Sequence, residues 1–291
     1  MGLNVSGQTN LLCLLGHPAK HSISPKMHTL ASQLLGLDYV YLAFDVKEED
    51  LAEVVSSFKK MGVAGFNLTM PHKSAIIPLL DEITEISRLT GAVNTVKFEY
   101  GRLYGTTTDG AGYIESLSEK NFTIPGKTVT ILGAGGAAKP IIAQMAFDKA
   151  KEINIFKRNN ATYKDTIAFA MEVEAHTDTK VVVYDMADIE ALKFCIEKSQ
   201  LLTNATNVGM EEDVSLVPKE FLRKGLLVSD IIYHPAMTKL LKDAKEVGAE
   251  YINGEFMLLY QGAKSFEIWT GEKMPVEDIK KACFMHEGET A

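Results

Sequence analysis

Cysteine is scarce in this sequence: three residues, Cys13, Cys195 and Cys283, are spread over a chain of 291. No Cys-x-x-Cys pair occurs, so the sequence predicts neither a zinc site nor a disulfide framework. The histidines at positions 17, 21, 28 and 72 share no spacing with acidic ligands, and we therefore predict no metal site. So few cysteines are typical of a protein in the reducing cytoplasm, which is the location we expect.

Positive charge and long apolar runs are scarce as well. The 30 Lys and Arg residues stand against 38 Asp and Glu residues, which gives a formal net charge of −8. No basic stripe or arginine run occurs, so the composition excludes nucleic acid as a partner. No apolar run approaches the ~20 residues that span a membrane. The N-terminus lacks the charged region and apolar core of a signal peptide, so we expect no membrane partner and no export.

Hydrophobic residues make up 46% of the chain, which is enough for two domain cores, taking about 150 residues per domain. Short apolar runs alternate with helical patterns, an order that predicts an α/β fold with mostly parallel sheets. The helix that begins near Ser24 is expected to use this serine as its N-cap, with Pro25 at the first helical position. The elements expected in the first half are strands 11–15, 39–44 and 65–69 and helices 24–35 and 48–61.

A break near Asp109 divides the pattern into two domains. We expect residues 1–109 to form an N-terminal α/β domain and residues 110–254 to form a second α/β domain. Helices within 255–291 are expected to pack back on the first domain. The elements expected in the second half are a connecting helix 110–120, strands 128–132, 153–156, 181–184, 201–204, 226–232 and 251–252, and C-terminal helices 257–269 and 276–284.

A glycine-rich turn separates the expected strand 128–132 from a long helix. Its sequence is Gly133-Ala134-Gly135-Gly136-Ala137-Ala138, which fits the G-x-G-x-x-A fingerprint in the context that the fingerprint requires. The first glycine allows a tight turn, the second lets a pyrophosphate approach the backbone, and the alanine lets helix and strand pack. The free N–H groups at the helix start favour phosphate binding. The turn therefore predicts a Rossmann domain that binds a dinucleotide.

The end of the next strand should select the cofactor. An acidic residue there would bind the ribose hydroxyls of NAD, and basic residues would bind the 2′-phosphate of NADP. The sequence has Lys157-Arg158-Asn159-Asn160, with no acid, which favours NADP. Asn160 can still bind a free ribose hydroxyl, and the two cations can equally be solvated surface charges. The residues alone leave the choice between NAD and NADP open.

Four polar clusters lie at strand ends or loops of the first half. In open α/β sheets, ligands bind beyond the carboxyl ends of the strands. Hydroxyls and amides suit a polyhydroxylated acid, and a lysine can handle a proton. Each cluster also has a structural alternative, such as a turn or a helix cap, but together they predict a substrate site. The clusters are His21-Ser22-Ile23-Ser24-Pro25, Asn67-Leu68-Thr69-Met70-Pro71-His72-Lys73, Gly91-Ala92-Val93-Asn94-Thr95 and Gly105-Thr106-Thr107-Thr108-Asp109-Gly110.

In the order and spacing of its motifs, the chain resembles the shikimate dehydrogenase family over nearly its whole length. Two C-terminal stretches, Leu258-Leu-Tyr-Gln-Gly and Trp269-Thr-Gly-Glu-Lys, resemble the quinate/shikimate branch. That branch is less strict about its cofactor and often takes NAD, so the resemblance favours NAD. The branch commonly has an aspartate where this chain has Asn160, and this departure leaves the choice between NAD and NADP open. The motifs that carry the resemblance are Ser22-Ile-Ser24-Pro25, Asn67-Leu-Thr69-Met-Pro71-His72-Lys73, Ala92-Val-Asn94-Thr95, Thr108-Asp109-Gly110-Ala-Gly112, Gly133-Ala-Gly135-Gly136-Ala137-Ala138, Asn204-Ala-Thr206-Asn207-Val-Gly209-Met210 and Gln261-Gly262-Ala263.

The resemblance implies a role for each matching position. Lys73 and Asp109 would be the catalytic pair, in which Lys73 positions and polarises the reacting oxygen or relays the proton with Asp109. Ser22 and Ser24 would bind the substrate carboxylate, with Tyr233 nearby. Asn67, Thr69, Asn94 and Gln261 would bind ring hydroxyls. The residues expected at the cofactor are Gly133, Ala134, Gly135, Gly136, Ala137, Lys157, Arg158, Asn159, Asn160, Asn207, Ile231 and Gly254.

The resemblance also implies the reaction: reversible hydride transfer between NAD or NADP and shikimate or 3-dehydroshikimate, in the chorismate pathway to aromatic amino acids. It leaves quinate open as a second substrate. Two rival interpretations are a methylene-tetrahydrofolate-type dehydrogenase and a sensor that binds NAD(P) and a metabolite without turnover. The Ser-x-Ser-Pro motif argues against the first, and the presence of both Lys73 and Asp109 argues against the second. The oligomeric state is not specified, and a homodimer is one of the assemblies that the sequence allows.

Overall fold

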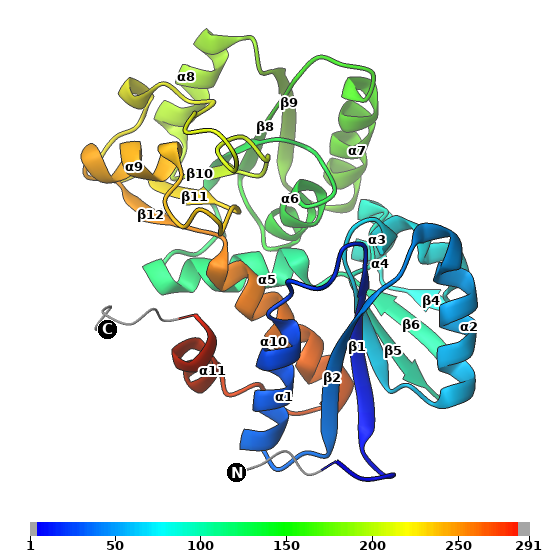
Figure 1. Cartoon of the computed structure of the whole chain (residues 1–291). Helices are drawn as coiled ribbons and strands as arrows, with labels where there is room; N and C mark the ends of the chain where they lie inside the picture. Colours follow the sequence, from blue (N-terminus) through cyan, green and yellow to red (C-terminus); the bar gives the residue numbers. More distant parts are fainter. Residues whose placement is uncertain (1–4, 285–291) are drawn as a thin grey trace. The chain divides into compact units, whose positions relative to one another are not determined.

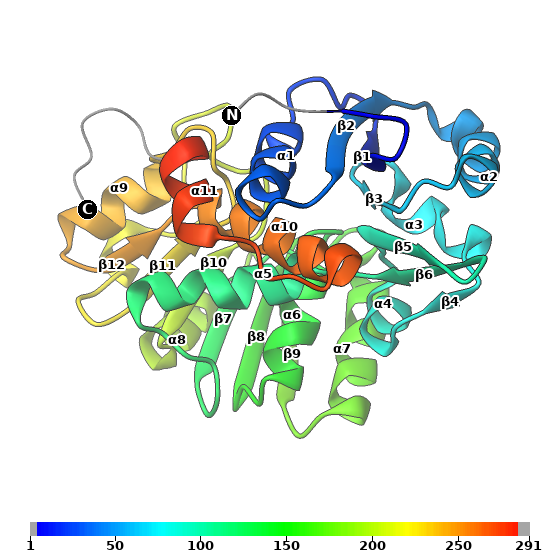
Figure 2. The same cartoon turned by 90° about the horizontal axis from the view of Figure 1, so that it is seen from below.

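The computed structural model describes residues 5–284 and divides into two compact units, which are residues 1–108 with 259–291 and residues 109–258 (Figures 1 and 2). Residues 1–4 and 285–291 of the expected first domain lie outside the described residues. The boundary of the second unit falls within one helix, α10 (Glu255–Thr270). No helix in the described part is both long and apolar enough to cross a membrane.

The first unit has a six-stranded sheet in the order β2-β1-β3-β5-β6-β4. The strand β1 pairs in parallel with β2 and with β3, as the alternation of strands and helices predicts. The bounds of these six strands are β1 Asn10–Gly16, β2 Tyr39–Asp45, β3 Gly65–Leu68, β4 Glu82–Ile83, β5 Thr95–Glu99 and β6 Arg102–Thr106.

An antiparallel hairpin that the sequence analysis did not predict completes this sheet. β5 pairs antiparallel with both β3 and β6. The two strands join at Tyr100 and Gly101, which have positive φ angles of 50° and 78°. Two such residues form the tight turn that matches the twist of a hairpin. The hairpin is important for the site, because it brings the residues before β5 and after β6 to the end of β3.

The apolar run of β1 is buried on both faces of the sheet. Cys13 and Leu15 lie in a cluster with residues of α2, whereas Leu12 and Leu14 pack in a cluster with Trp269 of α10. Alternate side chains of a strand point to opposite faces, so an uninterrupted apolar run is what a covered strand requires. Trp269 also donates from Nε1 to the Val96 carbonyl at 2.9 Å, which ties α10 to the sheet.

Helix starts in the first unit differ from the sequence prediction in two places. Ser24 is the first residue of its helix and not the N-cap, which is Ile23. The amide of Ser24 is bonded instead by the Ser22 hydroxyl, at 3.2 Å. The expected helix 48–61 begins with a 3-10 turn at Glu48–Asp50, as is frequent at the ends of α-helices. The helical bounds are α1 Ser24–Leu34, η1 Glu48–Asp50, α2 Leu51–Met61, α3 His72–Ala75, η2 Ile77–Leu79, α4 Glu85–Thr90 and α11 Val276–Cys283.

The second unit has a six-stranded, fully parallel sheet in the order β12-β11-β10-β7-β8-β9. Counted from β7, this is the doubly wound order of a Rossmann fold, with its topological switch point between β7 and β10. The strands are β7 Thr128–Leu132, β8 Glu152–Lys157, β9 Lys180–Asp185, β10 Leu201–Asn204, β11 Leu227–Asp230 and β12 Glu250–Ile252.

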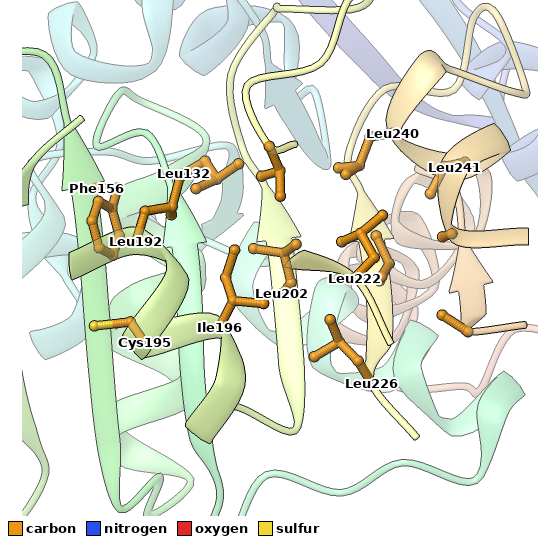
Figure 3. Close-up of a cluster of buried hydrophobic side chains, with 14 residues drawn as sticks. Leu132, Phe156, Leu192, Cys195, Ile196, Leu202, Leu222, Leu226, Leu240 and Leu241 are labelled. Carbon is orange, nitrogen blue, oxygen red and sulfur yellow. The ribbon is translucent and has the colours of Figure 1, made fainter. Parts of the chain in front are cut away.

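Leucine-rich helices cover this sheet. In Figure 3, Leu192 and Ile196 of α8 and Leu240 of α9 pack on Leu132 and Leu202 of the central strands. The expected connecting helix 110–120 is an α-helix from Asp109 to Ser116 that continues as a 3-10 turn. The helical bounds of this unit are α5 Asp109–Ser116, η3 Leu117–Lys120, α6 Ala138–Phe147, α7 Tyr163–His176, α8 Ile189–Lys198, η4 Lys219–Phe221 and α9 Lys239–Glu246.

Candidate functional site

The register of the first sheet aligns three polar positions at one edge. Asn67 of β3 is paired with Thr95 of β5, and Thr95 is paired with Thr106 of β6. Because β3 runs antiparallel to β5, the end of one strand lies beside the start of the other. Asn94 precedes β5 and Thr108 follows β6, so both lie next to Asn67. The sheet itself thus gathers the polar clusters that end β3, precede β5 and follow β6.

Asn67 is 5% exposed, and its amide is held from several sides. Its Oδ1 accepts from the Tyr41 hydroxyl at 2.8 Å. Its Nδ2 lies 2.9 Å from the Asn94 carbonyl, 3.0 Å from Thr95 Oγ1 and 3.1 Å from Ser265 Oγ. Burial raises the pKa of the Tyr41 phenol well above its usual value, so Tyr41 stays a hydrogen-bond donor.

Asn94 is buried and bridges three segments of the unit. Its Oδ1 accepts from the Thr108 amide at 2.8 Å, and its Nδ2 donates to Gln261 Oε1 at 3.1 Å. Three of the four hydroxyl-binding candidates are therefore connected: Asn67 reaches Asn94, and Asn94 reaches Gln261 of α10. Buried polar groups that all find partners hold one another in a single arrangement.

Three hydroxyl residues complete this group, although the sequence analysis did not single them out as site residues. Thr95 Oγ1 lies 2.7 Å from Ser265 Oγ, and Thr108 Oγ1 lies 3.1 Å from the same atom. Both threonines belong to polar clusters that the sequence showed. Ser265 follows Gln261 by four positions, a spacing that places both on one face of a helix. We call Asn67, Asn94, Thr95, Thr108, Gln261 and Ser265 the amide–hydroxyl cluster.

The two serines of the Ser-x-Ser-Pro motif lie together at the start of α1. The Ser22 hydroxyl accepts from the Ser24 amide at 3.2 Å. Ser24 is 6% exposed, whereas Ser22 is half-buried.

The turn that carries Thr69 and Lys73 is fixed by main-chain bonds on both sides. The Thr69 amide donates to the Leu15 carbonyl at 3.0 Å, and the Lys73 carbonyl accepts from the Val93 amide at 2.8 Å. The buried His72 ring reaches the Val46 carbonyl through Nε2 at 2.8 Å. Lys73 itself is half-buried, and the main-chain bonds of the turn fix its backbone just beyond the end of β3.

His28 is fully buried behind the serine motif and stacks on Tyr41, with ring centroids 4.4 Å apart. Burial lowers the pKa of His28 from its ordinary 6.5 to about 3. The unfolded chain therefore binds a proton at His28 below about pH 6.5, and the folded chain does not. We expect the free energy of unfolding to fall by about 1.4 kcal/mol per pH unit in this range as the pH drops. His28→Phe should keep the ring stack and remove this slope.

The single tryptophan makes this measurement local. Trp269 lies 5.4 Å from His28 between ring centroids, so its fluorescence reports the unfolding of this unit. Urea unfolding is followed from about pH 7 to about pH 4.5 for the wild type, His28→Phe and His176→Phe. His176 is exposed in α7, so its replacement should leave the slope unchanged. Equal slopes for the wild type and His28→Phe would contradict the prediction.

The glycine-rich turn of the second unit has the form that the fingerprint predicts. Gly133 has a φ of +101°, and a Cβ there would lie 2.8 Å from Thr206 Cγ2 and 2.9 Å from the Ala205 carbonyl oxygen. Only glycine fits such a position. A Cβ on Gly135 or on Gly136 would meet no atom of the chain within 4 Å. Packing therefore does not demand these two glycines, and their backbone is open to a phosphate group.

The segment after β8 places several hydrogen-bond donors around the side chain of Asn160. Asn160 Oδ1 accepts from Lys157 Nζ at 3.0 Å and from the amide and hydroxyl of Thr162 at 3.2 and 3.1 Å. The carbonyl end of Asn160 is therefore occupied, and its NH₂ end makes no hydrogen bond to the described part of the chain. Arg158, Asn159 and Asn160 are all exposed. The arrangement presents donors and positive charge, which suit a phosphate.

A buried carboxylate organises the ends of β10 and β11. Asp230 is fully buried, and burial raises its pKa. It accepts from the Ile232 amide at 3.0 Å, from Asn204 Nδ2 at 3.1 Å and from the Thr238 hydroxyl at 2.8 Å. The sequence analysis assigned no site role to Asp230. Because it joins two strand ends to the start of α9, it fixes the backbone that carries Ile231.

The remaining cofactor candidates lie around these strand ends. A Cβ on Gly254 would lie 2.0 Å from the Ile231 carbonyl oxygen, so the two backbones touch and the position requires glycine. Asn207 is exposed in the turn after β10, next to the turn that begins at Gly133. Tyr233 is 53% exposed in the segment after β11. Asp109 is buried as the first residue of α5, and Lys73 belongs to the other unit.

No group of three His, Cys, Asp or Glu side chains that could hold a metal ion occurs within residues 5–284. The residues of the second unit do fit a dinucleotide: a required glycine, two open glycines and a helix start follow β7. The residues of the first unit fit a small polyol acid, since buried amides and hydroxyls surround the end of β3.

Comparison with known proteins agrees with the fit of the first unit to a small polyol acid and of the second unit to a dinucleotide. The chain matches the model of the shikimate dehydrogenase substrate binding domain at residues 14–96 and that of the shikimate 5′-dehydrogenase C-terminal domain at residues 257–284. It is 46% identical to shikimate dehydrogenase (NADP(+)) of Streptococcus uberis, over 98% of each chain.

Two solved structures are similar over nearly the full length. The shikimate 5-dehydrogenase of Listeria monocytogenes, in complex with shikimate and NAD, is 44% identical with a TM-score of 0.94, and the match covers 98% of this chain and 99% of that one. A shikimate dehydrogenase in complex with NADP+ is 39% identical with a TM-score of 0.88, covering 97% of each chain. From its motifs, its two units and these relatives, the chain belongs to the shikimate dehydrogenase family.

Proposed function

We propose that this protein interconverts shikimate and 3-dehydroshikimate, with residues 1–108 and 259–291 binding the substrate and residues 109–258 binding NADP. Membership of the family makes the chain an oxidoreductase that acts on a CH–OH group with NAD or NADP, in the pathway to aromatic amino acids. The observation that carries the choice of substrate is the amide–hydroxyl cluster. A buried group of amides and hydroxyls discriminates strongly for ligands that complete its hydrogen bonds.

Substrate binding is assigned to the groups at the end of β3. Asn67, Asn94, Thr69 and Gln261 bind the ring hydroxyls, because their amides and hydroxyl can both donate and accept. Ser22 and Ser24 bind the carboxylate, and Tyr233 contributes near it. The rigid placement of Asn67 and Asn94 lowers the entropic cost of holding the ring.

Catalysis is assigned to Lys73 and Asp109. When bound, the nicotinamide takes the hydride from the ring carbon. Lys73 positions the hydroxyl that loses its proton and stabilises the negative charge that develops on its oxygen. The proton that leaves this hydroxyl goes to the pair of Lys73 and Asp109, which relay it together and so act as a unit. The fixed turn around Lys73 keeps the amine from moving as the charge develops.

Cofactor binding is assigned to the turn after β7 and the segments after β8, β10 and β11. Backbone N–H groups of Ala134, Gly135, Gly136 and Ala137 bind the pyrophosphate at the start of α6. Asn207, Ile231 and Gly254 contact the nicotinamide half. Lys157, Arg158, Asn159 and Asn160 surround the adenosine 2′ position.

NADP is the preferred cofactor in this proposal. The carbonyl end of Asn160 is held by Lys157 and Thr162, so the end that remains is a donor. A donor suits the oxygens of a 2′-phosphate, and Arg158 adds a positive charge. The resemblance to the quinate/shikimate branch favours NAD, but the aspartate that is common in that branch at this position is absent from this chain. Relatives that are named for NADP also support the choice.

Asn160→Asp is expected to reverse this preference. One carboxylate oxygen can keep the bonds to Lys157 and Thr162, and the other replaces a donor by an acceptor that repels a phosphate. The ratio of kcat/KM for NADP to that for NAD should fall by about 10- to 100-fold, since a charge-assisted bond is lost. Asn159→Asp places the same charge one residue away and is the control. The same fall in both variants would mean that charge alone, not the Asn160 geometry, sets the preference.

The proposed function is tested by initial rates of nicotinamide absorbance change with shikimate or quinate, each with NAD or NADP. We expect shikimate with NADP to give the highest kcat/KM. A higher kcat/KM with quinate than with shikimate would make quinate the preferred substrate instead. A higher value with NAD would overturn the proposed role of Asn160. No rate in any of the four conditions would overturn the proposed function as a whole.

A further inference from the structure

Ser265 lies at the centre of the amide–hydroxyl cluster and is fully buried. We propose that Ser265 is a positioning residue that sets the orientation of Asn67 and Asn94 and thereby the selectivity of the site for a polyhydroxylated ring. This inference rests on the proposed function. It assigns no contact between Ser265 and the substrate: the serine acts through the two asparagines.

The main chain fixes which way each asparagine amide faces. Asn94 Oδ1 accepts from the Thr108 backbone amide at 2.8 Å, which only an oxygen can do. Asn67 Nδ2 lies 2.9 Å from the Asn94 backbone carbonyl, which only a donor can approach. The NH₂ groups of both asparagines are therefore directed toward the hydroxyls of the cluster.

The hydroxyls then form two chains of hydrogen bonds that meet at Ser265. In the first chain, Asn67 Nδ2 donates to Thr95 Oγ1 at 3.0 Å, and Thr95 Oγ1 lies 2.7 Å from Ser265 Oγ. Asn67 Nδ2 also donates directly to Ser265 Oγ at 3.1 Å. In the second chain, Asn94 Nδ2 donates to Thr108 Oγ1 at 2.9 Å, and Thr108 Oγ1 lies 3.1 Å from Ser265 Oγ.

Ser265 ends both chains. Its own hydroxyl proton goes to the Gln261 backbone carbonyl at 3.0 Å, one turn earlier in α10. A serine oxygen has two lone pairs and one proton. The proton goes to Gln261, so Ser265 accepts, and three donors share its two lone pairs: Asn67 Nδ2 at 3.1 Å, Thr95 Oγ1 at 2.7 Å and Thr108 Oγ1 at 3.1 Å. Because its acceptor is a main-chain carbonyl of a helix, the direction of this last bond is fixed. Ser265 therefore offers the hydroxyls of Thr95 and Thr108 an acceptor other than Asn94 Oδ1.

Removing this hydroxyl should loosen the amides without removing them. In Ser265→Ala the protons of Thr95 and Thr108 lose their common acceptor and turn to Asn94 Oδ1, which lies 2.9 and 3.1 Å away. That oxygen already accepts from the Thr108 amide, so three donors compete for it. The Asn94 amide, and with it the bond to Gln261, loses its single orientation.

The main experiment compares Ser265→Ala with Thr270→Val on the same helix. Thr270 also donates its hydroxyl one turn back, to the Phe266 carbonyl at 2.8 Å, and lies beyond the cluster at the end of α10. We expect Ser265→Ala to raise KM for shikimate by about 5- to 10-fold and to leave KM for the cofactor within about twofold. Thr270→Val should change neither KM. Unchanged shikimate binding in Ser265→Ala, or an equal effect in Thr270→Val, would overturn the inference.

Selectivity separates positioning from a loss of stability. We expect Ser265→Ala to reduce the preference for shikimate over 4-deoxyshikimate or 5-deoxyshikimate by at least about threefold, because the asparagines no longer discriminate. Ser265→Thr, which keeps the hydroxyl, should restore the preference. A variant that is only unstable would lose activity toward shikimate and its analogues in proportion, and that result would count against the inference.

Variants that each interrupt one of the two hydrogen-bond chains provide an independent check if Ser265→Ala does not fold. Thr95→Val removes the hydroxyl that relays Asn67 to Ser265 and leaves their direct bond at 3.1 Å, and Thr108→Val removes the hydroxyl that relays Asn94 to Ser265. Each should raise KM for shikimate, and the combination should cost less than the product of the two effects, because both act through Ser265. Independent, multiplicative effects would contradict the proposal. If the wild-type protein has no activity with shikimate, the proposed function fails first, whatever the variants do.

Discussion

Lys73→Ala should lower kcat for shikimate oxidation by about 10³-fold and change KM for shikimate by less than about threefold. The reason lies in the turn that carries the lysine. Main-chain bonds at Thr69 and at the Lys73 carbonyl hold the turn, and the ring of His72 anchors it to Val46. Truncation of the side chain therefore leaves the backbone and the amide–hydroxyl cluster in place. What is lost is an interaction that strengthens only as charge develops on the reacting oxygen.

Two controls make this expectation specific. Lys60→Ala removes an exposed lysine at the end of α2 and should leave both constants unchanged. Added ethylamine should partly restore kcat in Lys73→Ala, because the missing chemical group is an amine. Asp109→Asn should lower kcat as well, and the double variant should be little worse than either single one, since groups that act as a unit are not additive. A rise of KM with kcat intact would make Lys73 a binding residue instead.

The dinucleotide half of the chain could be predicted from the sequence because its signals are local. The turn from Gly133 to Ala138 occupies six consecutive residues between a strand and a helix, and its geometry follows from the positive φ of Gly133. The parallel pairing of its strands follows from the alternation of strands and helices. The carbonyl of Asn160, by contrast, is held by Lys157 and Thr162, and only the structure shows which end of the amide is left.

In the substrate unit, the individual polar residues could be predicted from the sequence, but the hydrogen bonds that join them could not. The sequence shows Asn67, Asn94 and Gln261 as separate polar positions. Asn94 and Gln261 are 167 residues apart in the chain, and Asn67 and Ser265 are 198 apart. No periodicity within a segment reports a contact over that distance. The hairpin of β5 and β6, which brings Thr108 to Asn94, was missed for a related reason: its turn, Tyr100-Gly101, is not one of the common turn pairs.

Gly133→Ala should destabilise the second unit more than the same change at Gly126 or Gly136. The residue has a φ of +101°, and the new Cβ would meet Thr206 Cγ2 at 2.8 Å and the Ala205 carbonyl oxygen at 2.9 Å. Strain at such a backbone position costs on the order of 1–3 kcal/mol, and the steric clash adds to it. We expect the free energy of unfolding to fall by about 3 kcal/mol, measured by urea unfolding with far-ultraviolet circular dichroism.

The two other glycines separate the causes. Gly126 also has a positive φ, +74°, but its Cβ would meet no atom within 4 Å, so Gly126→Ala measures the backbone strain alone, at about 1 kcal/mol. Gly136→Ala has neither strain nor a clash and should leave the stability within about 0.5 kcal/mol. Its methyl group would instead stand where a phosphate approaches the backbone, so the Kd for NADP should rise by about tenfold or more. If Gly136→Ala bound NADP like the wild type, the pyrophosphate would not lie on this turn, and the helix start of α6 would lose its proposed role.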